Sequence, residues 1–396
     1  MKTFLSDKQE QLVKMVHKKI LITTYFFYPD NSPRAYRITA LAKMLTLKGH
    51  QVTVITNTAY NYDEFTKDNG IEVISLCKPT SDAVKRKPLK FSTANSNHAF
   101  YKIISPVKTL IRKSLLYFIP DGHLLPFSLR LNRCLRGIQL NHFDVVISNA
   151  NPFMVHLSTS LCLKRFKGIA IAETGDPYFY NHYRLAPYQA NIENWVLTQF
   201  TYITVPVERA VADYGNYGMI DKVRVIPHGF FFDEVQLKSY RPSETVKFAF
   251  AGRLYKEIRN PTQFLNSLVN NYSDYPFVFH IYTDLRNKET LELLLPFKLL
   301  LGDKIKIQDM LQRTDCIREL SSMDFLVNFE NDTSNQVPSK LVDYTLSERP
   351  IISINHNFDN KELFSNYIRH DFKAFKPLDI SSFNISNVVS KFESLF

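Results

Sequence analysis

Four loops of this sequence carry residues that could bind an anion or move a proton, and each follows a predicted strand. The first is the segment 28–34, which contains Asn31, Ser32 and Arg34. Pro33 suits the first helical position, so the free N–H groups of this helix start would bind an anion. The forked Arg34 guanidinium matches a phosphate or a carboxylate. An ordinary capped loop with a surface arginine is the alternative.

The second loop carries two acidic residues, Glu173 and Asp176, at the end of the strand-like segment 168–176. One carboxylate could accept a proton or hydrogen-bond the hydroxyl groups of a sugar. Two carboxylates held close together would also raise the pKa of one of them, which suits a base. The alternative is a simple turn, because Asp176 precedes a proline.

The third loop contains Arg253, Lys256 and Arg259, at the end of the strand-like segment 246–253. Three cations there could clamp a diphosphate leaving group, and stabilising such a developing charge is commonly the largest contribution to catalysis. This clamp would replace a divalent metal, and the sequence contains no D-x-D motif. A solvated basic loop is the alternative.

The fourth loop, 335–343, leads into a predicted helix. Pro338 marks the helix start, so the N–H groups of Ser339 and Lys340 would meet a phosphate at the positive end of the helix dipole. Asp343 lies one turn beyond Ser339 on the same helix face and could contact a ribose. A surface acid on the helix is the alternative for Asp343.

An alternation of strands and helices positions these loops. Apolar, β-branched runs typical of buried parallel strands occur at 18–27, 51–57, 70–76, 144–150, 168–176, 202–208, 222–229, 246–253, 277–284, 304–309, 325–330 and 350–355. Helical spacing of apolar residues occurs at 34–48, 152–166, 192–201, 260–271, 313–322 and 338–347. This order predicts parallel α/β sheets, in which ligands bind at the carboxyl ends of the strands.

The length of 396 residues suggests two or three domains. We predict two Rossmann-like, doubly wound parallel-sheet domains that face a cleft. Residues 1–229 would form the first domain and residues 246–375 the second, with a polar linker between them. Residues 376–396 would form a C-terminal helix that packs back on the first domain.

The formal net charge is +11, and the positive excess is concentrated in an insertion at 81–140. This insertion has eleven Lys and Arg residues against two acidic ones, interleaved with aromatic and aliphatic residues. Such a composition is typical of a surface that lies on an anionic bilayer, and no nucleic-acid-binding motif accompanies it. A solvated insertion whose apolar residues pack inward is the alternative.

Several classes of protein are disfavoured. Mean hydropathy is -0.19, and we find no apolar run of the ~18 residues that a membrane span requires. The N-terminal segment is charged throughout and lacks the apolar core of a secretory signal. The four cysteines lie far apart, which indicates reduced thiols in a cytoplasmic protein and no zinc cluster.

Six segments together resemble the glycosyltransferases with two Rossmann-like domains, the GT-B architecture, and in particular the family 4-like group. In order they are YFFYPDNSPRAYRITALAKMLTLKGHQVTVIT (25–56), DVVISNANP (144–152), ETGDP (173–177), VIPHGF (225–230), FAGRLYKEIRNP (250–261) and VPSKLVDYTLSERPII (337–352). The resemblance extends from residue 18 to about residue 355.

The resemblance implies that Arg253 and a second cation bind the diphosphate of a nucleotide sugar and that Asp343 holds its ribose. Family members usually carry the second cation five residues after the arginine, where this chain has an isoleucine. Lys256 or Arg259 must substitute, and we favour Lys256. Asn335 stands where the family commonly has the first of two glutamates.

The resemblance also concerns the first domain, which would bind the acceptor. His228 stands where relatives often have asparagine, and we expect a hinge or a donor contact there. Asn149 and Asn151 replace a histidine that many members present after this strand. His156, one turn into the following helix, is predicted to be a core or surface residue.

These observations predict a glycosyltransferase, of the hexosyl or a related class, in the synthesis of a capsule, a lipopolysaccharide or another surface polysaccharide. A nucleotide-diphosphate sugar would be co-substrate, with no cofactor and no metal. The donor-side residues would be Arg253, Lys256, Ser339, Lys340, Asp343, Asn335 and His228, the catalytic ones Asp176 and Glu173, and the acceptor or phosphate side Asn31, Ser32 and Arg34.

The predicted acceptor is a glycan or a lipid-linked sugar, and the predicted location is cytoplasmic, on the inner face of the cell membrane through 81–140. Nucleic acid is not an expected partner. A sugar-nucleotide epimerase of the same fold is one alternative. A non-catalytic partner subunit that keeps the fold is the other, favoured by Asn335 and by the missing histidine.

Overall fold

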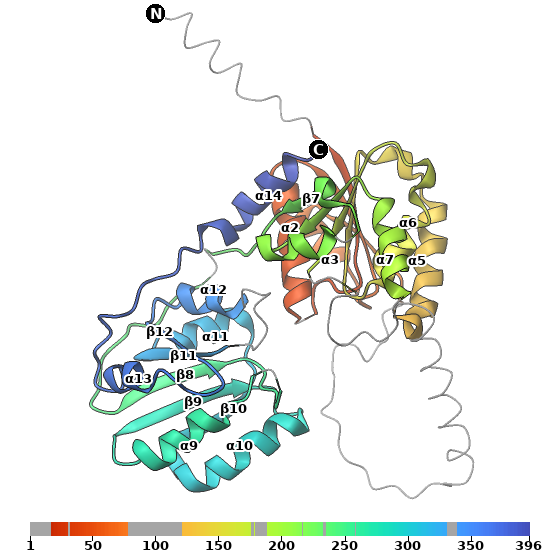
Figure 1. Ribbon diagram of the computed structural model, residues 1–396. Helices are drawn as coiled ribbons and strands as arrows, with labels where there is room; N and C mark the ends of the chain where they lie inside the picture. The colour runs from red at the N-terminus through yellow and green to blue at the C-terminus, as the bar shows by residue number, and fades with distance from the viewer. Residues whose placement is uncertain are drawn as a thin grey trace, which may run out of the picture. The chain divides into compact units, whose positions relative to one another are not determined.

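The computed structural model describes residues 17–30, 32–77, 121–175, 178, 188–215, 217–232, 235–257, 259–330 and 339–396 (Figure 1). The chain divides into two compact units. Unit 1 comprises Met1–Phe230 and Ile385–Phe396, and unit 2 comprises Phe231–Asn384.

In the described part of unit 1, seven parallel strands form one sheet in the order β3-β2-β1-β4-β5-β6-β7. They are β1 (Lys19–Thr23), β2 (Gln51–Thr56), β3 (Glu72–Ser75), β4 (Val145–Asn149), β5 (Ile169–Glu173), β6 (Tyr202–Val205) and β7 (Val223–Val225). The order reverses direction between β1 and β4, so the carboxyl ends of these two strands flank the switch point where such sheets bind ligands.

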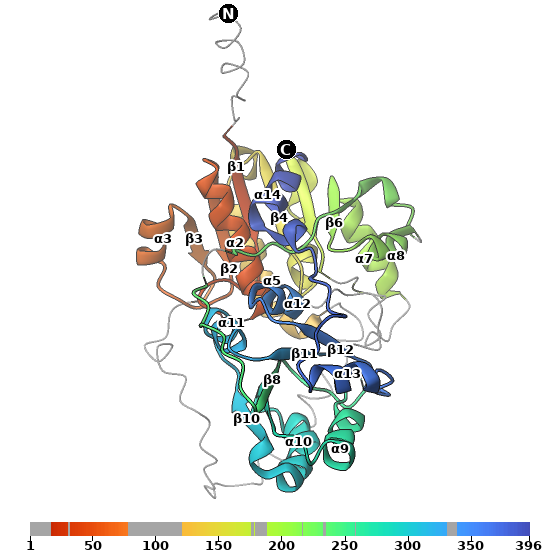
Figure 2. The ribbon, with the colours of Figure 1, turned by 90° about the vertical axis from the view of Figure 1, so that its left-hand side faces the viewer.

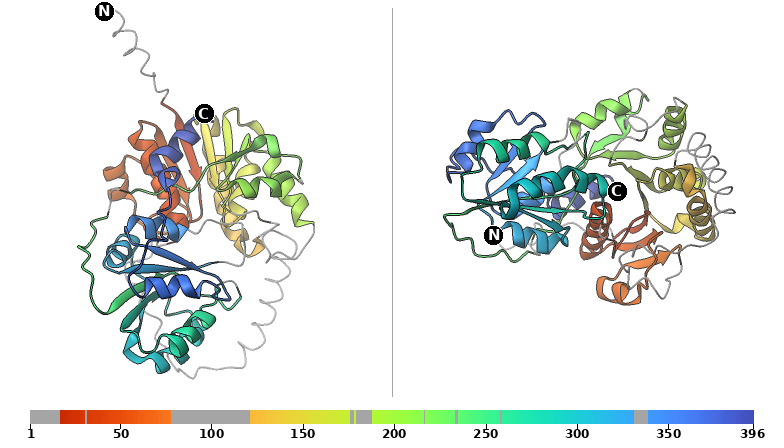
Figure 3. Two further views of the ribbon diagram at one scale, coloured as in Figure 1. Left: turned by 60° about the vertical axis from the view of Figure 1, so that its left-hand side comes forward. Right: turned by 90° about the horizontal axis from the view of Figure 1, so that it is seen from below.

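Helices cover both faces of this sheet. The described helices are α2 (Pro33–Leu47), α3 (Asp63–Asn69), α5 (Leu125–Gly137), α6 (Met154–Ser160), α7 (Gln189–Thr198), α8 (Val211–Gly215) and α14 (Ile385–Glu393). Right-handed crossovers put α2 and α3 on one face and α5, α6 and α7 on the other, as Figure 3 shows by their red-orange and yellow-green colours.

The C-terminal helix α14 lies against α2 (Figure 2). The Glu393 carboxylate contacts the Lys48 ammonium at 2.5 Å and the His50 Nε2 at 3.1 Å. Gly229 leaves room for this helix, because a Cβ there would lie 2.4 Å from the Ile385 side chain. The last residues of the chain therefore complete the first unit.

Helix α2 begins and ends where its sequence predicts. The Ser32 hydroxyl accepts a hydrogen bond from the Ala35 N–H at 3.3 Å, and Pro33 takes the first helical position. At the other end, Gly49 adopts a φ of +92°, which glycine accepts without strain. The loop that precedes α2 is thereby fixed at the carboxyl end of β1.

Unit 2 contains a parallel sheet of five described strands in the order β10-β9-β8-β11-β12. The strands are β8 (Val246–Ala251), β9 (Phe277–Thr283), β10 (Ile305–Asp309), β11 (Phe325–Phe329) and β12 (Ile351–Ile354). The described helices are α9 (Thr262–Asn271), α10 (Lys288–Leu301), α11 (Arg313–Leu320), α12 (Ser339–Leu346) and α13 (Lys361–Tyr367).

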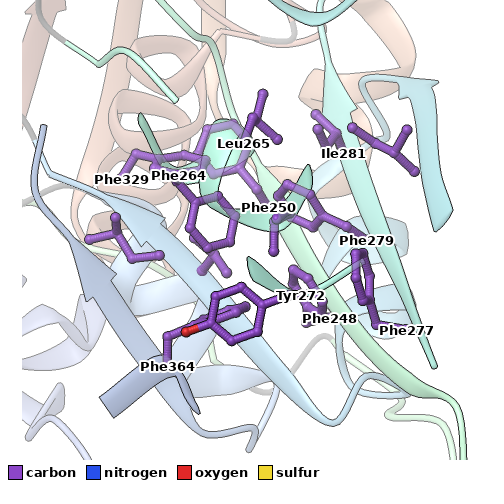
Figure 4. Close-up of a cluster of buried hydrophobic side chains, with 14 of the residues drawn as sticks. Phe248, Phe250, Phe264, Leu265, Tyr272, Phe277, Phe279, Ile281, Phe329 and Phe364 are labelled. Carbon is purple, nitrogen blue, oxygen red and sulfur yellow. The ribbon is translucent and has the colours of Figure 1, made fainter. Parts of the chain in front are cut away.

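Aromatic side chains fill the core of unit 2 (Figure 4). The Phe248 ring stacks on Phe279 and Phe325, with ring centroids 4.7 and 4.9 Å apart. Phe264 and Phe364 meet each other edge to face at 5.0 Å. Burying each such ring contributes roughly 1.5–3 kcal/mol, so this core holds β8 and β11 firmly beneath the loops that follow them.

The predicted fold class is confirmed: two doubly wound parallel α/β sheets are present. The described helices differ from the prediction in two ways. The helix predicted at 152–166 is shorter, since the Ser160 hydroxyl turns back to the Leu157 carbonyl at 2.9 Å and competes with the helical bonds. Helices α3, α5, α8, α10 and α13 were not predicted. None of the helices in the described ranges is long and apolar enough to cross a membrane.

Candidate functional site

In unit 1 a carboxylate is held at the carboxyl edge of the sheet. Glu173 ends β5, directly beside Asn149 at the end of β4. The Asn149 amide donates a short hydrogen bond to Glu173 Oε2, and its own Oδ1 accepts one of 3.0 Å from the Thr24 hydroxyl. The Glu173 side chain keeps 16% of its surface exposed. The Asn149 amide therefore orients this carboxylate, which stays partly exposed.

His228 lies next to this carboxylate without forming an ion pair. Its Nδ1 is 3.7 Å from Glu173 Oε1, which is too far for a hydrogen bond. Burial, and then the positive charges of Arg37 and Arg34, lower the pKa of His228 well below its ordinary value. His228 is thus neutral at pH 7.

Arg34 reaches the same edge from the first turn of α2. Its Nη1 donates to the Ala150 carbonyl at 3.2 Å. A Cβ added at Gly175 would lie 3.3 Å from this Nη1, so the guanidinium packs directly on the loop after β5. Ser32 serves mainly as the cap of α2. Asn31 and Asp176 lie outside the described residues.

His156, by contrast, is a core residue. It is fully buried, and its Nδ1 lies 2.8 Å from the Ser148 hydroxyl. Burial lowers its pKa to about 3. It supports the α6 side of the sheet and does not reach the edge.

In unit 2 three basic residues surround the end of β8. Arg253 follows Gly252, which takes a φ of +145°, and the Arg253 side chain is 53% exposed, 3.5 Å from Asp284 Oδ2. Arg259 lies close to Arg253 because the backbone of Arg259 pairs with that of Tyr255. The Arg259 Nη1 donates to the Arg253 carbonyl at 3.0 Å.

Lys340, in the first turn of α12 beside Ser339, is the third of these basic residues. Its Nζ donates to the Phe329 carbonyl at 3.2 Å and lies 4.7 Å from the centre of the Phe250 ring. Burial, and then the nearby Arg259 charge, lower the pKa of Lys340 well below its ordinary value. The Arg259 guanidinium and the Lys340 amine are therefore close together between β8 and α12, and this crowding disfavours the protonated form of Lys340.

Lys256 does not join this group. Its ammonium lies 3.0 Å from Glu292 Oε2, and its backbone N–H donates to Glu289 Oε1 at 2.9 Å, both on α10. The tight turn at residues 255–259 turns the two side chains in different directions. The structure thus places Arg259, and not Lys256, beside Lys340.

Asp343 lies one turn further along α12 and pairs with a residue that sequence reasoning missed. Arg313 Nε, on α11, donates to Asp343 Oδ1 at 2.8 Å. The next residue, Tyr344, is fully buried, and its hydroxyl accepts a 2.7 Å hydrogen bond from the Ala251 N–H at the end of β8. These contacts fix α12 against the loop of Arg253. Asn335 lies outside the described residues.

The two edges differ in chemistry. The edge of unit 1 offers an oriented carboxylate with a neutral histidine, which suits contact with hydroxyl groups or proton transfer. The edge of unit 2 offers cations and a helix start, which suit a phosphate. Within the described ranges, no three His, Cys, Asp or Glu side chains come together as a metal site would require.

Comparisons with known proteins agree with this chemistry. Residues 35–233 match the family described as Glycosyltransferase Family 4. No curated protein sequence matches the chain.

Three solved structures share the fold. A TarM variant from S. aureus, in complex with fondaparinux, alpha-GlcNAc-glycerol and UDP, has a TM-score of 0.62 and 11% identity, covering 96% of this chain and 99% of that one. A glycosyltransferase from Rickettsia africae ESF-5 has a TM-score of 0.56 and 13% identity over 96% and 98%. The lipopolysaccharide outer core galactosyltransferase WaaB has a TM-score of 0.56 and 11% identity over 95% and 98%.

Proposed function

The chain belongs to Glycosyltransferase Family 4, and we propose that it transfers a sugar from a nucleotide-diphosphate sugar to a glycan or lipid-linked acceptor during synthesis of a cell-surface polysaccharide. The observation that carries this proposal is the group formed by Arg253, Arg259 and Lys340 at the end of β8 and the start of α12.

These cations would bind the donor diphosphate. When the glycosidic bond breaks, negative charge develops on the departing diphosphate, and preorganised cations stabilise it without any reorganisation. Arg259 replaces Lys256 in this role, because Lys256 is engaged by Glu292. Asp343 would hold the ribose, and Arg313 keeps its carboxylate in place.

Glu173 would act on the acceptor side. Its carboxylate is oriented by Asn149 and lies beside a neutral His228, so it could accept a hydrogen bond or a proton from the attacking hydroxyl. Asp176 follows in the same loop and would share this role, and Arg34 would bind an anionic group of the acceptor.

The fold neighbours support the class of reaction. WaaB is by its description a galactosyltransferase of the lipopolysaccharide outer core, and the TarM complex holds UDP and sugar ligands. We therefore propose a surface polysaccharide as the product of this chain and a nucleotide sugar as its donor. The basic composition of 81–140 supports a location on the inner face of the cell membrane.

A panel of UDP-, GDP-, ADP- and dTDP-sugars tests the proposal. We expect one donor to release its nucleoside diphosphate slowly to water and faster with an acceptor glycan, and we expect Arg259→Ala to abolish both. Epimerisation of the sugar without acceptor, followed by NMR, would instead show an epimerase. Absence of binding to any donor would show a non-catalytic subunit.

A further inference from the structure

The helices α5, α6 and α7 expose large apolar side chains on the outer side of unit 1. α5 packs against α6, and α6 packs against α7, so the three form one layer (Figure 1). Leu129 on α5 is 62% exposed, Leu161 directly after α6 is 50% exposed, and Trp195 on α7 is 48% exposed. Exposed apolar side chains that gather on one surface and are rimmed by polar residues mark interaction sites.

These side chains lie on the outward surface of the layer. Leu129, Arg133 and Arg136 recur at helical spacing and form one exposed stripe on α5. Leu161 adjoins this stripe, because the Sγ of the next residue, Cys162, lies 3.4 Å from the Asn132 Oδ1 on α5. On α7, Trp195 is opposite the buried side of the helix, which carries Gln189, Glu193, Val196 and Leu197.

The charge of this surface is mainly positive. Residues 122–168 and 188–201 contain two acidic residues: Glu193, which is only 1% exposed, and Asp144, which is exposed just before β4 and accepts a 2.8 Å hydrogen bond from the Lys19 N–H. The same segments expose five cations, namely Arg133, Arg136, Lys164, Arg165 and Lys167, and in the described part of the chain none of the five pairs with a carboxylate.

Another exposed apolar surface shows that this pattern is not general. Leu295, Leu299 and Leu300 on α10 of unit 2 are exposed as well. Glu292 on the same helix and Asp303 just beyond it are also exposed. Acidic and basic side chains are thus mixed on α10, where Lys288 is 91% exposed beside Glu292, whereas α5, α6 and α7 expose cations and no acidic side chain.

We propose that the outer surface of α5, α6 and α7 docks on an anionic lipid bilayer. Leu129, Leu161 and Trp195 would enter the boundary between headgroups and acyl chains, where tryptophan is favoured. The five cations would contact the lipid phosphates. This inference rests on the proposed function, because a transferase that uses a lipid-linked acceptor must reach the membrane, and it names the surface that does so.

Trp195 makes the test direct, because it is the only tryptophan of the chain. Fluorescence of the full-length protein is followed on adding vesicles of phosphatidylcholine with phosphatidylglycerol. We expect a blue shift, quenching by brominated acyl chains, and loss of both at about 0.5 M salt. Vesicles of phosphatidylcholine alone should produce neither. Vesicle binding without any change in Trp195 emission would overturn the proposed surface.

A pair of charge-matched variants locates the surface. Arg133→Glu with Arg136→Glu should weaken partition to the anionic vesicles at least about tenfold. Lys288→Glu with Lys306→Glu makes the same change in net charge on exposed residues of unit 2 and should leave partition within about twofold. Equal losses in the two variants would mean that net charge alone governs binding and would overturn the inference.

Nucleotide binding separates this inference from the proposed function. The Arg133→Glu, Arg136→Glu variant should be stabilised by nucleoside diphosphate as strongly as the wild type. If vesicles fail to bind while the nucleotide still stabilises the protein, only the docking surface is refuted. Salt-sensitive binding of a DNA duplex as tight as that of the anionic vesicles would also refute it.

Discussion

Arg313 Nε donates a hydrogen bond of 2.8 Å to Asp343 Oδ1 and so joins α11 to α12. The Arg313 side chain is 12% exposed and that of Asp343 is 27% exposed. A carboxylate with this partner cannot swing freely into solvent. The pair therefore holds the Asp343 carboxylate in a fixed position, one helical turn from Lys340. In the proposed function, Asp343 would contact the ribose of the nucleotide and Lys340 its phosphates.

Two substitutions of Asp343 separate its contribution to stability from its contribution to nucleotide binding. Asp343→Ala leaves Arg313 without its acceptor and should lower the free energy of unfolding by about 1–3 kcal/mol. Asp343→Asn keeps an acceptor for Arg313 and should cost less than about 1 kcal/mol, yet weaken nucleoside diphosphate binding about tenfold. Urea unfolding and calorimetric titration measure the two effects. Full affinity in Asp343→Asn would remove the ribose role.

Lys340 should take up a proton when a diphosphate binds. Burial and Arg259 lower its pKa in the free protein, and a bound phosphate would favour the ammonium form. Above the lowered pKa, affinity should therefore fall as pH rises. Titration calorimetry in two buffers of different ionisation enthalpy measures the uptake, which Lys340→Met should abolish. Equal binding heats for the wild type in both buffers would contradict proton uptake by Lys340.

The same residue affects stability in the free protein. The unfolded chain binds a proton that native Lys340 lacks, between the lowered pKa and the ordinary value of 10.5. Stability contributed at this position therefore rises with pH through that window. The wild type should therefore gain stability relative to Lys340→Met as the pH increases through this window, as urea unfolding at several pH values measures.

His156 should make unit 1 sensitive to acid. It stays neutral in the native state with a pKa of about 3, whereas the unfolded chain binds a proton below about 6.5. Stability is therefore lost as pH falls, by about 2 kcal/mol at pH 5. His156→Gln lacks this loss, so its deficit against the wild type in urea unfolding should be smaller at pH 5 than at pH 7. A constant deficit would contradict it.

Glu173 should matter for transfer and not for donor binding. Glu173→Gln should lower kcat at least about 100-fold, with donor affinity within about twofold, since the donor is held by unit 2. Asn149→Ala should lower kcat less, by about tenfold, because the carboxylate remains but loses its orienting amide. Steady-state kinetics with a saturating acceptor measure both. A Glu173→Gln enzyme with more than a tenth of wild-type kcat would exclude the proposed role.

The sequence predicted most of the strands because parallel strands are buried on both faces and read as continuous apolar runs, as in β8 and β9. The sequence pattern did not reveal helix α10, because its apolar residues are not confined to one face. Its sequence is apolar around much of its circumference and contains Pro296, so no narrow apolar stripe marks it. The Asn287 cap, whose side chain accepts from the Thr290 N–H, was the available signal.

The positions of candidate residues were predictable where one element alone sets them: Glu173 and Arg253 lie at the ends of β5 and β8, and Arg34 lies in the first turn of α2. The partners that fix them were not. Arg313 comes from another helix, and Asn149 meets Glu173 only because β4 and β5 pair in one register. Tertiary packing decides such contacts, and a single sequence gives no spacing that reveals them.

The choice between Arg259 and Lys256 illustrates the same point. They are three residues apart in one basic loop, and sequence favoured Lys256. The turn that pairs Tyr255 with Arg259 directs Arg259 toward Lys340 and leaves Lys256 against Glu292. Backbone geometry therefore determines which of the two side chains lies beside Lys340.

Nucleoside diphosphate binding to Arg259→Ala and Lys256→Ala tests the central claim most directly. Both variants remove one positive charge from the same loop, so they differ only in position. We predict that titration calorimetry shows affinity at least about tenfold weaker for Arg259→Ala and within about twofold of wild type for Lys256→Ala. Loss of affinity in Lys256→Ala with full binding in Arg259→Ala would contradict the account.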